Sequence, residues 1–453
     1  MTRKPLGWVG IVRLGLVQSA LGSIVVLTTS TLNRVMAVEL ALPVMLPAAL
    51  VAWHYVVQLS RPRWGHGSDM GQRRTPWIVG GMGVLALGAL LATNATAIMA
   101  SSPAVGIILA LIAFSMIGGG VGAAGTSLLA LLATRVVPAR RPAAAAITWI
   151  MMIVGIVITA GVAGALLDPF SMQRLAMIAS GIAFIAFTVT LVAVMGVEGT
   201  AEAVAVATGT EPRPSFGVVL RETLADPQAR RFGIFVFVSM LAYSAQDLIL
   251  EPFAGLVFGM TPGQSTQMSS VQHGGVLLGM ILVGAAGGMI GGRGSGWMRG
   301  WTVLGCAGSA VALFGLAMAA EAGPGWPIRQ TVFALGFFNG IFAVAAIGSM
   351  MGLAGAGQDG QTSGGREGIR MGVWGAAQAI AFAAGGFFGA VGVDVGRQVF
   401  AETSTAFLTV FAVEGLLFIV SAGIALTIGG AAAATRTSKN FTPPVGDTGH
   451  VQA

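Results

Sequence analysis

Long apolar runs, separated by short segments that carry most of the charges, recur along the whole of this sequence. Each run is close to the roughly 20 residues that a helix needs to cross a bilayer core about 30 Å thick. With 55% hydrophobic and only 9% charged residues, a chain of 453 residues has too few polar residues to cover the surface of a water-soluble fold. We therefore predict an all-α membrane protein. The runs predict twelve transmembrane helices, at residues 12–33, 43–60, 77–98, 104–134, 143–167, 174–196, 232–256, 267–291, 301–320, 328–353, 371–393 and 405–429.

The basic residues predict the orientation of these helices. Of the 24 Lys and Arg residues, all but four lie in the terminal segments or in every second connection. The four exceptions are Arg34, Arg174, Arg329 and Arg397, which lie at the other ends of the predicted helices. Because basic residues accumulate on the cytoplasmic side, we predict that both termini are cytoplasmic. The net charge of +7 then reflects membrane topology, and we expect no nucleic-acid partner.

The longest charged connection divides the predicted helices into two sets of six. In each set a turn that carries Arg and is flanked by Trp follows the second helix, so the halves look like repeats. Two six-helix halves joined by a cytoplasmic linker are typical of the major facilitator fold. The predicted domains are an N-terminal half at 1–196, a linker with a surface helix at 197–231, a C-terminal half at 232–429 and a disordered cytoplasmic tail at 430–453.

Several strings carry a resemblance to a known family. RWGHGSDMGQRR at 63–74 resembles the signature turn of the facilitator superfamily, although it is one residue shorter than the usual spacing. Asp69 can accept hydrogen bonds from a helix N-terminus and pair with an Arg, which would lock the helix ends. The matching residues are Gly65, Asp69, Gly71, Arg73 and Arg74. More specific strings are TTSTLNRVMAVELALP at 28–43, RPRWGHGSD at 61–69, RRTPWIVGGM at 73–82 and AYSAQDLILEPFAG at 242–255, and these resemble the PucC/LhaA family of purple phototrophic bacteria, the bacteriochlorophyll delivery branch of the superfamily.

This resemblance implies an assembly factor, or chaperone, for the light-harvesting antenna LH1 or LH2 in the bacterial inner (intracytoplasmic) membrane. Such a protein would bind bacteriochlorophyll a and deliver it to nascent antenna polypeptides. Its partners would be the light-harvesting alpha and beta polypeptides or the growing antenna ring, with bacteriochlorophyll synthase as a further candidate. Two alternatives stay open from the residues: a proton-coupled secondary transporter of a small molecule, and a scaffold that binds antenna polypeptides without a ligand.

Enzyme motifs are missing from the sequence. A prenyl-transferring synthase needs Asp-rich clusters to hold Mg and diphosphate, and the chain has none. It also lacks a Walker loop, a zinc-binding pair of His residues on one helical face and a Gly-x-Ser-x-Gly elbow. The lone Cys306 excludes an internal disulfide and a Cys-based metal cluster. We therefore expect that the chain is not an enzyme and holds no metal site.

Scarce charges lie inside the predicted helices. Asp247 and Glu251 are four residues apart, on one face of the seventh helix, and Arg34 lies at a similar height in the first. An unpaired charge at membrane depth costs several kcal/mol, so each needs a partner. We predict that Arg34 pairs with Asp247 or Glu251 at the outer face, as a moving gate or as a fixed ion pair. Glu414, mid-way along the twelfth helix, either turns inward, is protonated or faces a bound partner.

Two histidines also fall in predicted helices. Given the resemblance, His54 and His273 are candidate axial ligands for the Mg of bacteriochlorophyll, because a neutral imidazole nitrogen binds without adding charge. Gly274 and Gly275 would leave room for a flat macrocycle beside His273. The alternative is that each His forms a hydrogen bond with a neighbouring helix. Four amides either line a central cavity or join helices: Gln18, Asn33, Gln246 and Gln378.

Overall fold

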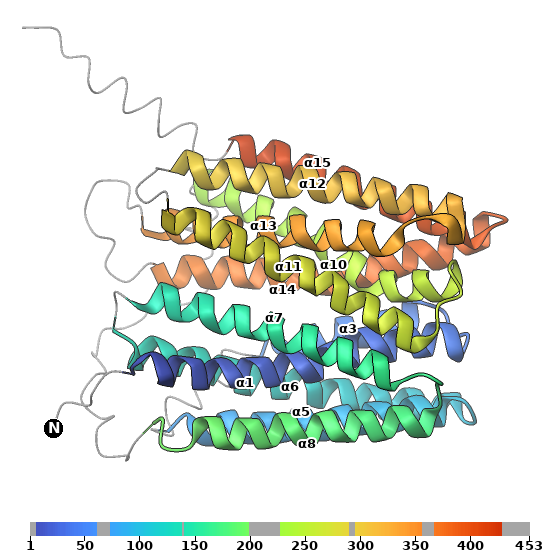
Figure 1. Ribbon diagram of the computed structural model, residues 1–453, viewed down its shortest axis with the longest axis horizontal. Helices are drawn as coiled ribbons and strands as arrows, with labels where there is room; N and C mark the ends of the chain where they lie inside the picture. The colour runs from blue at the N-terminus through green and yellow to red at the C-terminus, as the bar shows by residue number, and fades with distance from the viewer. Residues whose placement is uncertain are drawn as a thin grey trace, which may run out of the picture.

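The structure is a computed structural model that describes residues 6–60, 73–137, 140–198, 227–289, 295–355 and 367–427. Its helices run side by side along one axis of the molecule (Figure 1). In the described part, eleven helices are long and apolar enough to cross a membrane, and a shorter apolar helix, α3, spans Met45–Gln58. The prediction of a multi-pass, all-α membrane protein is confirmed.

The first half holds the helices up to residue 194. α1, η1, α2 and η2 follow one another without a break and form one span, Trp8–Glu39. The π-helical segment η1 begins where the hydroxyls of Thr28 and Thr29 donate to carbonyl oxygens of the preceding turn, a pattern that often accompanies local widening of a helix. The elements are α1 (Trp8–Val26), η1 (Leu27–Thr31), α2 (Leu32–Arg34), η2 (Val35–Glu39), α3, α5 (Thr75–Met99), α6 (Pro103–Arg135), α7 (Arg141–Leu166) and α8 (Met172–Val194).

The second half holds the helices from residue 227 onward. Proline stands in the first turn of α5, α6 and α7 in the first half, and Pro227 and Pro262 begin α10 and α11 here. A proline at this place costs nothing, because the first N–H groups of a helix have no partner within it. The elements are α10 (Pro227–Leu256), α11 (Pro262–Met289), α12 (Ser295–Ala322), η5 (Gly323–Gly325), α13 (Ile328–Gly355), α14 (Glu367–Val399) and α15 (Thr403–Thr427).

The helix packing of the first half is repeated in the second. α1 packs on α7 and α8 as α10 packs on α14 and α15. α6 packs on α3 and α5 as α13 packs on α11 and α12, and the contact of α5 with α8 matches that of α12 with α15. The halves meet where α7 contacts α11 and where α3 contacts α14. In Figure 1, α12 and α15 lie along one edge of the bundle, α5 and α8 along the opposite edge, and α7 and α11 between them.

The domain boundaries stay a prediction. Residues 199–226, which include the expected surface helix, and the expected tail from 430 lie outside the described residues. The connections at 40–44, 100–102, 167–171, 257–261, 323–327 and 400–402 lie at the end of the bundle that the basic residues predict to be outside, and we call it the outer end.

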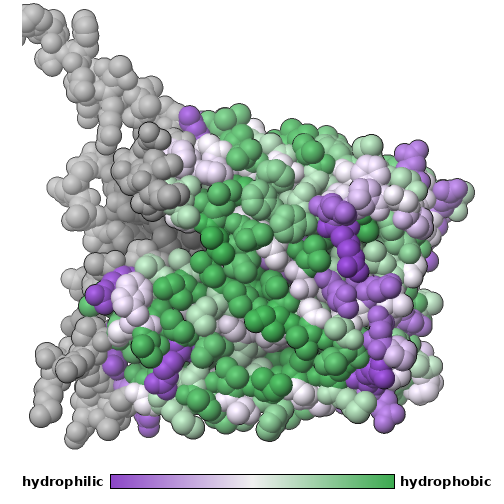
Figure 2. Space-filling model, in the orientation of Figure 1, coloured by the Kyte–Doolittle hydropathy of each residue, from purple (hydrophilic) through white to green (hydrophobic). Residues whose placement is uncertain are grey.

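The surface has the pattern of a membrane protein. In Figure 2 a broad hydrophobic area covers the middle of the visible face, and hydrophilic residues gather at the outer end. Large apolar side chains such as Phe184 and Ile185 are exposed on the described helices. Because lipid is as apolar as these side chains, their exposure is what a bilayer-spanning surface requires.

Candidate functional site

The outer end of the first span is tied to the second half through polar side chains. Arg34 is only 1% exposed, forms a salt bridge with Glu39 and donates from Nη2 to the carbonyl oxygen of Met260 at 2.6 Å. Its neighbour Asn33 donates from Nδ2 to the carbonyl oxygen of Leu248, also at 2.6 Å. Met260 lies in the connection between α10 and α11. The two halves are therefore joined here by side chains of one half and backbone carbonyls of the other.

The structure gives Arg34 a salt bridge with Glu39, and the predicted pairing of Arg34 with Asp247 or Glu251 stays a prediction. Glu39 takes the salt bridge, because it lies five residues further along the same span, in η2, and reaches Arg34 without crossing between helices. Counting rise per residue gave the height of Arg34 but not the direction in which it points. Glu251 remains within electrostatic reach of Arg34. Their role as a gate stays a prediction.

Two further contacts join the halves at the outer end. The carboxylate of Asp394, near the end of α14, accepts from the backbone N–H groups of Val44 at 3.1 Å and Met45 at 2.7 Å, and so caps the N-terminus of α3. The hydroxyl of Thr261 donates to Asp168 Oδ2 at 2.9 Å. We call these contacts the outer latch: Arg34 with Met260, Asp394 with Val44 and Met45, and Asp168 with Thr261. They hold the outer end of the bundle closed.

A row of polar side chains joins α10 to α11 on the inward side of the latch. Gln272 donates from Nε2 to Asp247 Oδ1 at 3.2 Å, and Ser269 donates from Oγ to Glu251 Oε1 at 2.6 Å. One turn beyond Ser269, His273 Nδ1 lies 2.8 Å from the Ser269 carbonyl oxygen. We call these five side chains the α10–α11 row. The two carboxylates thus find neutral donors on α11, and the prediction had named only Arg34 for them.

His273 has a defined orientation in this row. A carbonyl oxygen can only accept, so Nδ1 carries the proton and the neutral ring keeps its lone pair on Nε2. The side chain is partly exposed, and a Cβ added at the neighbouring Gly274 would meet no atom within 4 Å. Gly275, in contrast, packs against the backbone of α13. The hydrogen bond to the Ser269 carbonyl oxygen therefore leaves Nε2 as the ring nitrogen of His273 that can act as a ligand.

His54 has a different environment. It is 1% exposed, and its Nε2 lies 2.8 Å from Nε2 of Gln58 on the same helix. Its ring packs against Tyr55, with 4.7 Å between centroids. Tyr55 contacts Phe382 of α14, which contacts Tyr243 of α10, with centroid separations of 5.6 Å and 5.8 Å. His54 thus adjoins an aromatic bridge between the halves, and its Nε2 is engaged within its own helix.

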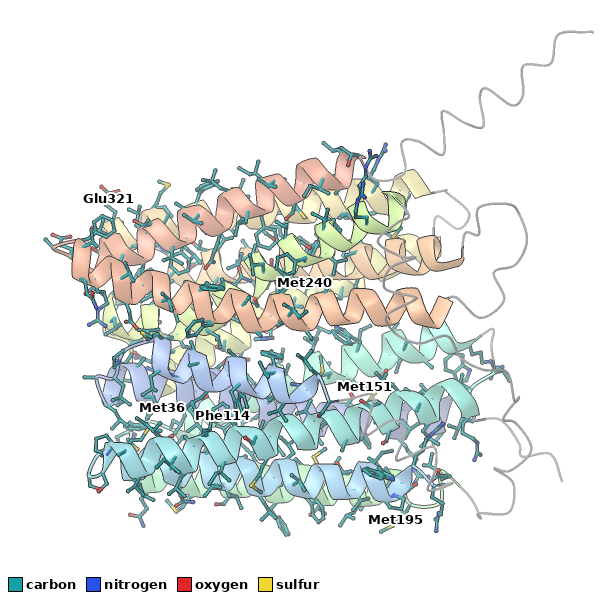
Figure 3. All side chains as sticks on the ribbon, turned by 180° about the vertical axis from the view of Figure 1, so that it is seen from behind. Met36, Phe114, Met151, Met195, Met240 and Glu321 are labelled. Atoms are coloured by element: carbon teal, nitrogen blue, oxygen red, sulfur yellow. The ribbon has the colours of Figure 1, made fainter. Side chains whose placement is uncertain are left out.

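Glu414 is buried, with only 2% of the residue exposed, and its role stays a prediction. It lies within electrostatic reach of Asp247. The amides of Gln18 and Gln378 lie near methionine sulfurs of neighbouring helices, at 3.3 Å from Met152 Sδ and 3.7 Å from Met240 Sδ. Met240 is labelled on α10 in Figure 3. These two amides therefore join helices within each half.

The signature turn is only partly described. Gly65, Asp69 and Gly71 lie outside the described residues, whereas Arg73 is exposed and Arg74 donates from Nη1 to the carbonyl oxygen of Ala130 at 2.5 Å. The N-terminus of α5 is capped by a residue that the sequence did not reveal. The Glu198 carboxylate, beyond α8, accepts from the backbone N–H groups of Arg74 at 2.6 Å and Thr75 at 2.8 Å.

Glu198 is held in its ionised form by this cap. Burial by itself would raise the pKa of the Glu198 carboxyl, but the hydrogen bonds from Arg74 and Thr75 and the positive charge of Arg73 together outweigh burial and place the pKa below its usual value. Arg135 also donates from Nη1 to the Glu198 carbonyl oxygen at 2.7 Å. The segment after α8 thus closes against α5 and α6.

A shallow groove of about 600 Å³ lies on the surface between α3, α5 and α6. Its lining is mainly apolar, and a Cβ added at Gly80 or Gly119 would meet no atom within 4 Å. At its edge Trp53 donates from Nε1 to Ser115 Oγ at 2.7 Å. The exposed side chains of Val84 and Ile112 place the groove on the surface that lipid covers.

Comparison with known proteins gives consistent relatives over nearly the whole chain. A family model described as PUCC protein matches residues 31–432. The Bacteriochlorophyll synthase 44.5 kDa chain of Rhodobacter capsulatus is 51% identical over 431 residues, which cover 95% of this chain and 98% of that protein. Protein PucC of Cereibacter sphaeroides is 30% identical over 385 residues, covering 82% of this chain and 80% of that one.

Solved structures share the fold at low sequence identity. A peptide transporter POT in complex with sulfate superposes with a TM-score of 0.66 at 14% identity, covering 94% of this chain and 97% of the transporter. A mutant of the nucleoside transporter NupG gives a TM-score of 0.65 at 13% identity, covering 93% of this chain and 100% of the transporter. The predicted facilitator fold is confirmed by this likeness, which concerns fold alone.

One expectation is contradicted by the comparisons. The chain was expected not to be an enzyme, because it lacks the Asp-rich clusters of a prenyl-transferring synthase. Yet the relative that is 51% identical carries the name of a bacteriochlorophyll synthase chain. A missing motif excludes only the chemistry that uses that motif, so the expectation was too broad.

Proposed function

The chain belongs to the PUCC protein family, and from this premise we propose that it is an assembly factor for the light-harvesting antenna of a phototrophic bacterium. It binds bacteriochlorophyll and delivers it to antenna polypeptides as they insert into the bacterial inner membrane, with both of its own termini in the cytoplasm. The names of relatives support a link to this pigment, since one of them is called a bacteriochlorophyll synthase chain. The fold supports the membrane location, because the pigment and the antenna helices are soluble only in the bilayer.

The single observation that carries the proposal is the geometry of His273. Bacteriochlorophyll, if bound, would supply a Mg ion that a neutral imidazole nitrogen could ligate. The hydrogen bond from Nδ1 to the Ser269 carbonyl oxygen orients the ring and raises the basicity of Nε2. The open space at Gly274 leaves room for a flat ring beside the helix. His273 therefore fits the role of pigment ligand, whereas Nε2 of His54 is already engaged by Gln58.

Antenna polypeptides, or the growing antenna ring, are the proposed recipients of the pigment. Bacteriochlorophyll synthase is a second proposed partner, because it would supply the pigment within the same membrane. A protein that receives pigment from one membrane partner and passes it to another needs a site that opens and closes. The outer latch supports this function by closing the outer end and leaving exchange to the other end or to the lipid side.

The proposal is tested by deleting the gene from a phototrophic host and measuring antenna absorption in its membranes. We expect loss of the antenna bands, recovery with the wild-type gene and little recovery with His273→Leu. His54→Leu is the matched control and should restore the bands. Tagged protein should also co-purify with antenna polypeptides. A deletion strain with a normal antenna spectrum would contradict the proposal.

The second candidate function is proton-coupled transport of a small molecule. The observation that favours it is the pair of carboxylates in the α10–α11 row, Asp247 and Glu251, within a fold shared with transporters. Proton-driven uptake into proteoliposomes that contain the purified protein would favour this function over assembly.

A further inference from the structure

Pro252 interrupts the hydrogen bonding of α10 near its outer end. In an α-helix each backbone carbonyl accepts from the N–H group four residues further along the chain. Proline has no N–H group, so Pro252 leaves the carbonyl oxygen of Leu248 without its partner inside the helix. Leu248 is buried and lies about 12 Å from the outer end of α10, at 1.5 Å per residue. A buried backbone carbonyl without a partner costs free energy, so this one needs a donor from elsewhere.

Asn33 supplies this donor from the other half of the molecule. Its Nδ2 donates to the Leu248 carbonyl oxygen at 2.6 Å. Asn33 is 0% exposed, so the bond is shielded from solvent. The N–H of a side-chain amide has the same donor chemistry as the backbone N–H that proline lacks. The side chain of Asn33 in α2 therefore completes the hydrogen bonding of α10 at its proline.

The local structure of the first span directs several side chains toward the second half. Asn33 lies in α2, which has only three residues and stands between the π-helical segments η1 and η2. Such wide turns are rare and often lie at functional sites. Thr31 Oγ1 lies 3.3 Å from Thr266 Oγ1, and Arg34 donates to the carbonyl oxygen of Met260 at 2.6 Å. Three of the four residues 31–34 therefore contact the second half through a polar group.

Asn94 provides a comparison within the same half. Its Nδ2 donates to the Leu90 carbonyl oxygen at 2.8 Å, within its own helix α5. Such a bond moves with its helix and is the same however the two halves are placed. The bond from Asn33 to the Leu248 carbonyl, in contrast, exists only while α2 and α10 lie against each other. It therefore contributes to the free-energy difference between a closed and an open outer end, and the bond of Asn94 does not.

We propose that Asn33, Leu248 and Pro252 form a lock on the closed outer end, which we call the proline lock. The proline creates a carbonyl without an N–H partner in α10, and the closed arrangement supplies the donor from α2. Separation of α2 from α10 would leave the Asn33 amide and the Leu248 carbonyl without partners at membrane depth, which opposes opening. The proline lock is independent of what the protein carries, so it goes beyond the proposed function.

The proline lock is tested by the rate at which a water-soluble maleimide labels a cysteine between the halves. In a Cys306→Ala background, Thr266→Cys places a single thiol at a buried position beside Thr31, where labelling requires opening. Asn33→Leu should raise the labelling rate of this parent about tenfold, the order expected when a buried carbonyl loses its donor. Asn94→Leu is the matched control and should label at the parent rate. Equal elution volumes on gel filtration show that the variants are folded.

Pro252→Ala separates the proline lock from any general effect of changing Asn33. The new N–H group at position 252 can donate to the Leu248 carbonyl within α10, so that the carbonyl no longer depends on Asn33. Asn33→Leu should therefore change the labelling rate much less in the Pro252→Ala background than in the parent. Asn33→Ala removes the same donor with a smaller side chain and should give the same result.

Two outcomes would overturn the proline lock. One is an Asn33→Leu variant that labels at the parent rate. The other is an equal effect of Asn33→Leu in the parent and in the Pro252→Ala background. Labelling needs no pigment, so failure of this test is distinguishable from failure of the proposed function.

Discussion

At the scale of single residues, the carboxylates in the described part of the chain are held by hydrogen bonds from neutral donors more often than by opposite charges. Glu198 accepts from two backbone N–H groups, Asp394 does the same at α3, and Asp247 accepts from an amide. A salt bridge inside a bilayer needs two desolvated charges, whereas a helix N-terminus offers aligned donors without a second charge. The carboxylates of Glu198 and Asp394 therefore fix the N-termini of α5 and α3.

Glu198→Gln should weaken the closure of α8 against α5. The pKa of Glu198 is lowered in the folded protein, so its stabilising contribution is present at neutral pH and is lost as the pH falls through that lowered pKa. We expect a cost of about 1 kcal/mol at neutral pH, typical of a lost helix cap. Thermal unfolding of wild type and variant at neutral and acidic pH measures it. The difference in melting temperature should close at acidic pH, and a difference that is the same at both pH values would contradict this account.

At the scale of elements, glycines set how closely α11 and α13 approach. A Cβ added at Gly279, Gly336 or Gly340 would overlap a backbone carbonyl oxygen of the other helix. Gly336 lies against the backbone of Gln272, the residue that donates to Asp247. The close approach thus fixes the position of the α10–α11 row as well as the stability of the half.

Gly340→Ala should destabilise the protein by about 1–3 kcal/mol, the usual cost of overpacking a tight contact. Gly284→Ala is the matched control, because a Cβ at Gly284 in α11 would meet no atom within 4 Å. Thermal unfolding of both variants in detergent compares them directly. Equal stability of the two variants would show that α11 and α13 are not in close contact.

The sequence predicted the elements better than their contacts. Apolar length and the positions of basic residues were enough to predict the helices, because the bilayer demands a minimum apolar length for each span. The partners of Arg34, Asp247 and Glu198 were missed for a physical reason. Rise per residue gives the depth of a side chain, whereas the partner depends on the azimuth of each helix, which packing against neighbours decides. The inward direction of Glu414 was one of several open alternatives for the same reason.

At the scale of the whole molecule, the two halves share their helix packing but differ in where their buried polar side chains lie. α10 packs on α14 and α15 as α1 packs on α7 and α8, so the two halves share one arrangement of helices. The α10–α11 row lies in the second half. The outer latch closes one end of the seam between the halves.

A disulfide across the seam tests this closed outer end. Thr31 Oγ1 and Thr266 Oγ1 lie 3.3 Å apart and belong to different halves. In a Cys306→Ala background, Thr31→Cys with Thr266→Cys should form a disulfide on mild oxidation, seen as a shift in mobility on a gel after cleavage of the linker. Thr29→Cys with Thr266→Cys is the control and should react little, because Thr29 points away from Thr31 on the helix. No cross-link in the first pair would show that the outer end is open.

The proposed role of His273 as the ligand of bacteriochlorophyll is tested most directly by the absorption spectrum of protein purified from a pigment-producing host. Wild type and His54→Leu should carry bacteriochlorophyll in a fixed ratio to protein, and His273→Leu should lose most of it while keeping its elution volume and melting temperature. Colourless wild-type protein, or pigment that is equally abundant in His273→Leu, would contradict the account.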